Sequence, residues 1–193
     1  MVFTLLLAGN GTISPCLSWF FWFLSTHPLV EAKILEDIEN WIPDLDKLVY
    51  LHGAICETLM LYPPIPFEHK GSFNDDILPS GDRVGRKTKI LYFLYTMGRM
   101  EQTWGEGRRE FKPERWISEK GRIVHMASYK FIAFNAGPTS CLGKDMSIIQ
   151  LKMVAVAILE KYHIQVVEHI PITPRISAIL GIKHGLQVKV TKR

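Results

Sequence analysis

The first 30 residues of the chain contain no Lys, Arg, Asp or Glu, and the first charged side chain is Glu31. Apolar runs at residues 2–8 and 16–24 are separated by a polar, glycine-containing stretch that ends at Pro15. A membrane span needs about 20 consecutive apolar residues, and a signal peptide needs a basic start that this chain lacks. We expect a helix buried inside protein, apolar on all sides. A membrane anchor and a signal peptide are the alternatives.

The composition indicates a folded protein. The chain has 193 residues, 47% of them hydrophobic, which excludes disorder and predicts a single domain over 1–193. The net charge of +4 is mild and scattered, so nucleic acid is not an expected partner. The three cysteines form no CxxC pair, which excludes a zinc ribbon and a disulfide scaffold. For Cys16 and Cys56 we expect packing in the core.

The first half of the sequence predicts two further helices. The first has apolar residues at helical spacing, with acidic residues opposite. The second has one apolar stripe and ends at a pair of prolines. The boundary signals are Ser25 or Thr26 as a cap, Pro28 in the first turn, Pro43 after the first helix, Asp46 near the start of the second, and Pro63–Pro64 at its end.

The second half mixes strands, turns and one long helix, so the fold class is α+β and mainly helical. Glycine and proline punctuate the middle of the chain, and apolar alternation returns near its end. The expected segments are turns and short hairpins at 66–89, a strand at 90–95, an irregular meander at 97–133, a helix at 142–162, and a terminal hairpin that pairs 164–166 with 186–190.

Cys141 lies where the long apolar helix begins. A helix N-terminus favours the thiolate through its dipole and its free N–H groups. Gly137 and Gly143 remove side chains on both sides, so a large flat group could approach the sulfur closely. From these residues alone, a metal ligand, a nucleophile and a buried structural thiol all stay open.

Four motifs in this order resemble the cytochrome P450 family. The pattern Phe134-x-x-Gly137-x-x-x-Cys141-x-Gly143 is similar to the haem-binding loop of that family. Residues Ala8–Thr12 with Leu17–Trp22 resemble the family's central helix. Residues Glu57–Pro64 resemble the ExxR helix and its exit, and Phe111–Trp116 resemble the meander. The resemblance implies the C-terminal portion of the cytochrome P450 fold, beginning partway along the central helix. The family's N-terminal membrane anchor is then absent from the chain.

Two segments sharpen the resemblance to one branch of the family. Residues 61–70 and 128–138 are similar to plant enzymes that hydroxylate long-chain alkanes and fatty acids. The resemblance implies a haem-thiolate monooxygenase that uses molecular oxygen, a long-chain aliphatic substrate and an NADPH-dependent reductase. It also implies the endoplasmic reticulum membrane, on its cytosolic face. Basic residues that could meet the reductase are Arg108, Arg109, Lys112 and Lys144.

The resemblance assigns a task to each motif residue of the haem site. Cys141 is the axial thiolate ligand of the iron of haem b, and it pushes electron density toward bound oxygen. Phe134 shields the sulfur, while Gly137 and Gly143 let the porphyrin pack closely. Thr12 is the hydroxyl that hydrogen-bonds oxygen on the opposite face.

A buried charged network accompanies the haem site in the family. The resemblance places Glu57 and Arg115 in that network, but the arginine of the ExxR motif is replaced by Met60. Removing one member of a buried ion group typically costs about 3–5 kcal/mol. The chain is therefore expected to hold its Glu57–Arg115 pair without the supporting partner.

Two further departures concern the cofactor and oxygen. An arginine that pairs with a haem propionate in the family is replaced by Thr139, and Lys70 is a candidate for supplying that charge. The acid that precedes the helix threonine is replaced by Gly11, which weakens proton delivery. The alternative function is a truncated, non-catalytic family remnant with impaired haem binding. A reading outside the family is a small membrane-anchored protein that uses residues 2–24 as its span.

Overall fold

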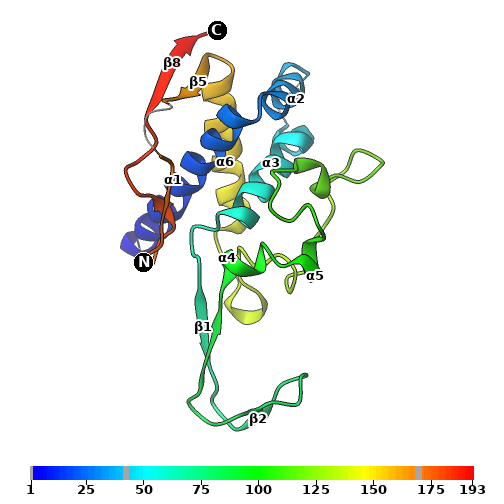
Figure 1. Ribbon diagram of the computed structural model, residues 1–193, viewed down its shortest axis with the longest axis vertical. Coiled ribbons are helices and arrows are strands. Elements are labelled where there is room, and N and C mark those ends of the chain that lie inside the picture. The colour runs from blue at the N-terminus through cyan, green and yellow to red at the C-terminus, as the bar shows by residue number, and fades with distance from the viewer. Residues whose placement is uncertain (1, 41–43, 168–170) are drawn as a thin grey trace.

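A computed structural model describes residues 2–40, 44–167 and 171–193. The larger helices gather in one body, and the hairpins that follow α3 extend away from it (Figure 1). The helices are α1 (Val2–Thr26), α2 (Pro28–Glu39), α3 (Val49–Leu61), α4 (Leu94–Met97), α5 (Glu101–Trp104) and α6 (Lys144–Leu159), with short 3-10 helices η1 (Leu45–Lys47), η2 (Pro113–Trp116) and η3 (Gly137–Thr139).

The strands pair as antiparallel two-stranded sheets throughout the described residues. Their bounds are β1 (Glu68–Gly71) with β4 (Lys89–Tyr92), β2 (Asp76–Ile77) with β3 (Arg83–Val84), β5 (Tyr162–Val166) with β8 (Val188–Lys192), and β6 (Pro174–Arg175) with β7 (Gly181–Ile182). This mixture of helices with small sheets confirms the α+β prediction.

Helix α1 is buried along its C-terminal half only. Trp19 and Phe20 are each 1% exposed, and the Trp19 ring stacks on Tyr62 with 3.9 Å between ring centroids. Near the N-terminal end, Phe3 and Leu7 are 87% and 79% exposed. The predicted helix is confirmed, but its burial on all sides applies to only half of its length. Within the described residues, no helix combines the length and the hydropathy that crossing a membrane requires.

Helix α2 follows α1 after one non-helical residue, His27. Its N-cap is His27, so the expected cap at Ser25 or Thr26 is wrong; both residues belong to the last turn of α1. Pro28 occupies the first turn as predicted, where its missing N–H is not needed. The expected stop at Pro43 falls outside the described residues.

Helix α3 forms the centre of the core. It begins at Val49 rather than near Asp46, because Asp44 accepts a 3.1 Å hydrogen bond from the Asp46 N–H and caps η1 instead. Ten of its 13 residues are buried. Among them, Leu51, Ala54 and Ile55 are at most 1% exposed. The helix ends at Leu61, before the proline pair, as predicted.

Several predicted boundaries in the second half differ from the structure. The strand expected at 90–95 ends at Tyr92, and α4 begins at Leu94, because a short apolar run fits a strand and a helix equally well. The long helix is shorter than 142–162 at both ends. The terminal hairpin pairs Tyr162–Val166 with Val188–Lys192, so its first strand begins two residues earlier than predicted and its second strand lies two residues later.

The end of the chain packs against its beginning. The Trp19 Nε1–H donates to the Leu180 carbonyl at 3.2 Å, and the Val166 N–H donates to Ser25 Oγ at 2.9 Å. The buried Glu31 carboxylate on α2 accepts from Arg193 and lies 3.3 Å from His163 Nδ1. Helices α1 and α2 are therefore fixed to the C-terminal hairpins.

Candidate functional site

The Cys141 loop is held by its own backbone. The Cys141 N–H donates to the Phe134 carbonyl at 2.8 Å, and the Ser140 N–H donates to the Gly137 carbonyl at 3.0 Å. Asn135 and Gly137 have positive φ angles of 61° and 67°, and the Asn135 side chain supports the turn by accepting from the Ala136 N–H at 2.8 Å. The loop delivers the thiol next to the start of α6.

The space around the Cys141 sulfur is open. Cys141 is exposed, and its neighbour Leu142 has a fully exposed side chain. A side chain added at Gly137 would meet nothing within 4 Å, whereas one added at Gly143 would lie 3.9 Å from the sulfur. A planar ligand therefore has access to the thiol from the side of these glycines. Phe134 is partly buried against the core, with the Lys144 ammonium 6.0 Å from its ring centroid.

Lys70 of β1 reaches the same loop from a distant part of the sequence. Its Nζ donates to Thr139 Oγ1 and, at 3.0 Å, to Asn135 Oδ1. The cation thus lies beside the residue that replaces the expected arginine. This contact is consistent with Lys70 supplying the positive charge of the missing arginine. The contact of Lys70 with a haem propionate stays a prediction.

Glu57 of α3 forms a buried network with the meander. Its side chain is 0% exposed, and Oε1 accepts from Arg115 Nε at 2.9 Å and from the Lys112 N–H at 3.0 Å. Oε2 accepts from Trp116 Nε1 at 2.7 Å. Burial raises the pKa of the Glu57 carboxyl, while the Arg115 charge and these donors act in the opposite direction. The expected pairing of Glu57 with Arg115 is observed.

Met60 leaves the network without its second arginine, but another arginine caps the helix. Met60 is 3% exposed, and Gly98 packs against its carbonyl so closely that a Cβ there would lie 2.1 Å from the oxygen. Next to it, Arg99 Nη1 donates to the Leu61 carbonyl in the last turn of α3. A cation at a helix C-terminus stabilises the unpaired carbonyls and the dipole. Arg99 therefore fixes the C-terminal end of α3, and the chain then continues to β1, which carries Lys70.

Thr12 is part of α1, in the stretch before Pro15. Its hydroxyl donates to the Ala8 carbonyl at 2.7 Å. No hydrogen bond or ion pair within the described residues joins Thr12 directly to the Cys141 loop. The structure thus brings together Phe134, Gly137, Cys141 and Gly143 in one loop, and Glu57 with Arg115 in one network.

A lysine is buried in α6, the helix that follows the Cys141 loop. Lys152 of α6 is 2% exposed, and its Nζ donates to the Leu45 carbonyl at 2.6 Å. Burial lowers its pKa, opposed by Asp46 and Asp37. Burial, reinforced by the Lys152 charge, also lowers the pKa of His52 to about 4. Cys16 and Cys56 lie in the core, where burial raises both thiol pKa values.

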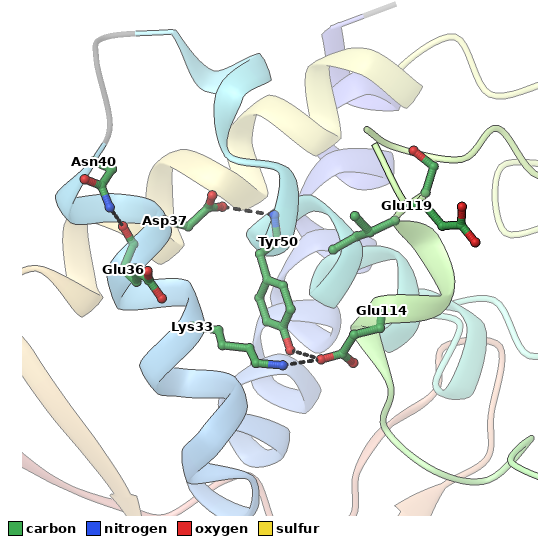
Figure 2. A pocket seen from close by; sticks show the side chains of 9 residues that line it. Lys33, Glu36, Asp37, Asn40, Tyr50, Glu114 and Glu119 are labelled. Carbon is green, nitrogen blue, oxygen red and sulfur yellow. Dashed lines mark hydrogen bonds and ion pairs between the residues drawn. The ribbon is translucent and has the colours of Figure 1, made fainter. Parts of the chain in front are cut away.

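A hollow of the described surface lies between α2 and η2, and none of its lining residues belongs to the Cys141 loop. It measures about 650 Å³ and is lined mainly by polar side chains. Figure 2 shows Lys33 and Tyr50 pointing at Glu114, with Nζ and OH 2.6 and 2.7 Å from Oε1. Asp37 accepts from the backbone N–H groups of Tyr50 and Leu51. These paired groups hold α2, α3 and η2 together.

Comparison with known proteins identifies the family. A sequence model of the family described as "Cytochrome P450" matches residues 1–190. The chain belongs to the cytochrome P450 family. The family implies a haem cofactor, and the exposed Cys141 loop is the candidate for holding it. Within the described residues, no cluster of three or more His, Cys, Asp or Glu could hold a metal ion. A haem iron requires only one protein thiolate on this face, so the exposed thiol and its glycines fit the group.

Three similar proteins come from plants. Alkane hydroxylase MAH1 of Arabidopsis thaliana is 49% identical over 195 residues, covering 100% of this chain and 39% of the relative. Noroxomaritidine synthase 2 of Narcissus aff. pseudonarcissus MK-2014 is 41% identical, with coverages of 99% and 40%. Cytochrome P450 86B1 of Arabidopsis thaliana is 38% identical, with coverages of 97% and 37%. The chain thus spans about two fifths of the length of these relatives.

Sequence reasoning left three residues unassigned whose contacts the structure shows. Trp116 donates a hydrogen bond to Glu57. The sequence placed it at the end of the meander motif but gave it no role. Lys152 is buried, and its signal was a single lysine within the apolar run of α6. Arg99 was also unassigned, and nothing in its local sequence indicates that it caps α3.

Proposed function

We propose that this part of a cytochrome P450 binds haem b through the Cys141 thiolate. We further propose that it serves the hydroxylation of aliphatic C–H bonds in long-chain alkanes or fatty acids. The observation that carries the proposal is the exposed Cys141 thiol beside two glycines, in a loop fixed by its own backbone bonds at the start of α6. The alkane hydroxylase among the relatives supports the substrate class.

Each residue of the loop has a distinct task in this proposal. The bound haem supplies the oxygen-activating chemistry. Cys141 acts as thiolate, favoured by the N-terminal end of α6 and its free N–H groups. Phe134 limits access of water to the sulfur, and Gly137 and Gly143 leave the space that a flat ring occupies.

Lys70 supplies the positive charge that the family takes from the arginine before the cysteine. Its ammonium is already positioned by Asn135 and Thr139, so the side chain loses little further freedom on meeting a carboxylate. A lysine forms one point contact where an arginine forms a bidentate pair, so haem retention is expected to be weaker than in relatives with arginine.

The remaining partners follow from the family. An NADPH-dependent reductase delivers electrons at the cytosolic face of the endoplasmic reticulum membrane, and molecular oxygen is the second substrate. Arg109, Lys112 and Lys144 are exposed, whereas Arg108 pairs with Glu101 at 3.0 Å. The exposed three are the basic groups available for an acidic redox partner. In this proposal, Thr12 provides the hydroxyl that hydrogen-bonds oxygen.

A second candidate is a non-catalytic remnant with impaired haem binding. It is favoured by the substitutions at Thr139, Met60 and Gly11, which affect cofactor retention, folding and proton delivery respectively. The two candidates make opposite predictions for the binding of haem by this chain.

The deciding experiment is a reduced carbon monoxide difference spectrum of the chain expressed with added haem. The matched control is Cys141→Ala, with Cys16→Ala as a variant that removes a core thiol instead. A red-shifted thiolate–haem band present in the chain and in the Cys16 variant, but absent from the Cys141 variant, supports the proposal. A folded chain without this band supports the remnant.

A further inference from the structure

A line of aromatic rings connects the Cys141 loop with the meander. Phe134, whose carbonyl accepts from the Cys141 N–H at 2.8 Å, lies 6.4 Å from Phe131 between ring centroids. Phe131 lies 4.6 Å from Trp116, and Trp116 lies 5.8 Å from Trp104. Electron transfer weakens steeply with distance, and tryptophan is among the side chains most easily oxidised by one electron. The line therefore offers a short path for an electron from two buried tryptophans to the Cys141 loop.

The two tryptophans differ in what their indole N–H groups contact. The Trp116 Nε1–H donates to the Glu57 carboxylate at 2.7 Å, whereas the Trp104 Nε1–H donates to the Met97 carbonyl at 3.1 Å. Loss of an electron makes an indole N–H strongly acidic, so a proton acceptor at hydrogen-bond distance can take the proton. A carboxylate is such an acceptor, and a backbone carbonyl is not. Of this pair, Trp116 is therefore the one that can become a neutral radical by losing an electron and a proton together.

The surrounding charges favour the same tryptophan. The Arg115 guanidinium and the Lys130 ammonium lie 5.8 and 4.9 Å from the centroid of the Trp104 ring. Cations at this distance raise the energy of a radical cation on that ring. Burial raises the pKa of the Glu57 carboxyl, which makes it a better acceptor for the Trp116 proton. Trp116 itself is 2% exposed, so water has little access to a radical formed there.

We infer that Trp116 and Glu57 form a site that gives up one electron to an oxidant held at the Cys141 loop. The electron leaves the Trp116 indole, and its N–H bond breaks as the proton moves to Glu57 Oε2. The products are a neutral indolyl radical and a neutral carboxylic acid, and the oxidant is reduced by one electron. The site thereby draws an oxidising equivalent away from the Cys141 thiol. That the oxidant is haem-based rests on the proposed function, whereas the oxidation of Trp116 does not.

The test places a photo-oxidant on the exposed Cys141 thiol of the full chain without haem. A thiol-reactive ruthenium polypyridyl complex labels Cys141, because Cys16 and Cys56 are buried. A laser flash with an added electron acceptor converts the label to ruthenium(III), and transient absorption records the species that forms next. We expect the spectrum of a neutral tryptophanyl radical. Its formation is expected to slow in heavy water, because the N–H proton moves together with the electron.

Two variants locate the radical. Trp116→Phe keeps an aromatic ring but removes the indole, and the radical signal is expected to be lost. The matched control is Trp104→Phe, which removes the neighbouring buried indole and is expected to leave the signal unchanged.

Three outcomes overturn the inference. They are a flash that produces no tryptophanyl radical, a radical cation whose formation is unchanged in heavy water, and a signal that persists in Trp116→Phe. The first two are measured on the unmodified chain, so they decide the question even if Trp116→Phe does not fold. The carbon monoxide spectrum uses haem in place of the ruthenium label, so failure of the haem proposal and failure of the oxidation site are distinguishable.

Discussion

The Glu57 network offers the sharpest test of how the fold supports the site. In Glu57→Gln the side chain keeps its shape but has one carbonyl oxygen and one NH₂ group. If the amide oxygen faces Arg115 and the Lys112 N–H, the NH₂ group faces the Trp116 Nε1–H, another donor. In the reverse orientation, the NH₂ group faces the two donors of Arg115 and Lys112. Either orientation leaves a buried donor unpaired and removes the charge that faces Arg115.

The magnitude follows from burial. Breaking a buried ion pair costs about 3–5 kcal/mol, but the neutral amide also recovers part of the cost of burying a charge, which is large because Glu57 is fully buried. We expect a loss of about 3 kcal/mol in the free energy of unfolding, out of a total of about 5–15 kcal/mol. With a slope of about 2 kcal/mol per molar urea, the unfolding midpoint falls by about 1.5 M.

The assay is urea unfolding followed by tryptophan fluorescence, with the exposed Glu119→Gln as the control. The control is expected to stay within about 0.5 kcal/mol of the unmodified chain. Trp116→Phe removes the opposed N–H, so the double variant with Glu57→Gln should lose about 1 kcal/mol less than the sum of the single losses. A midpoint shift below about 0.3 M for Glu57→Gln, or strict additivity, would refute the reasoning.

Four further predictions follow from the described contacts. The pKa of His52 is about 4 in the folded chain and lies below the unfolded value, so His52 binds its proton more readily in the unfolded chain. The free energy of unfolding should therefore fall by at most about 3 kcal/mol as pH drops from about 6.5 to 4. His52→Gln should flatten this dependence in urea titrations at acid pH. Pro15→Ala should raise the free energy of unfolding by about 2–3 kcal/mol in the same assay, since proline is about 3 kcal/mol worse than alanine inside a helix. Lys70→Met should weaken haem binding about tenfold in a spectral titration while Lys70→Arg retains it, and equal affinities would contradict the assigned charge. Arg99→Met should cost about 1–2 kcal/mol through the uncapped end of α3, which thermal unfolding would detect as a lower midpoint.

The elements that the sequence predicted well are those with strong, local signals. The proline pair ends α3 where expected, and the glycines around Cys141 indicated a loop, although its exposure was not predicted. The Glu57–Arg115 contact joins residues far apart in sequence, and only the resemblance of two separate motifs to one family pointed to it. Periodicity alone would have left that pair undetected.

The features that sequence reasoning missed depend on tertiary context. A serine or threonine next to Pro28 looks like a cap, but α1 continues through both residues because its aromatic face packs into the core. The burial of Lys152 depends on the carbonyl of Leu45, which belongs to a segment more than a hundred residues earlier. Such partners are decided by packing between distant elements, which no local window of sequence contains.

The contacts between α1, α2 and the C-terminal hairpins have a consequence for folding kinetics. Trp19 and Leu180 are 161 positions apart, and Glu31 and Arg193 are 162 apart. Contacts of such separation carry a large loop-closure entropy and form late. On the ribosome, the parts of α1 and α2 that contact the C-terminal hairpins therefore stay uncovered until those hairpins have been synthesised. The exposure of these surfaces to chaperones and proteases thus lasts for the time needed to translate from α2 to the C-terminal hairpins.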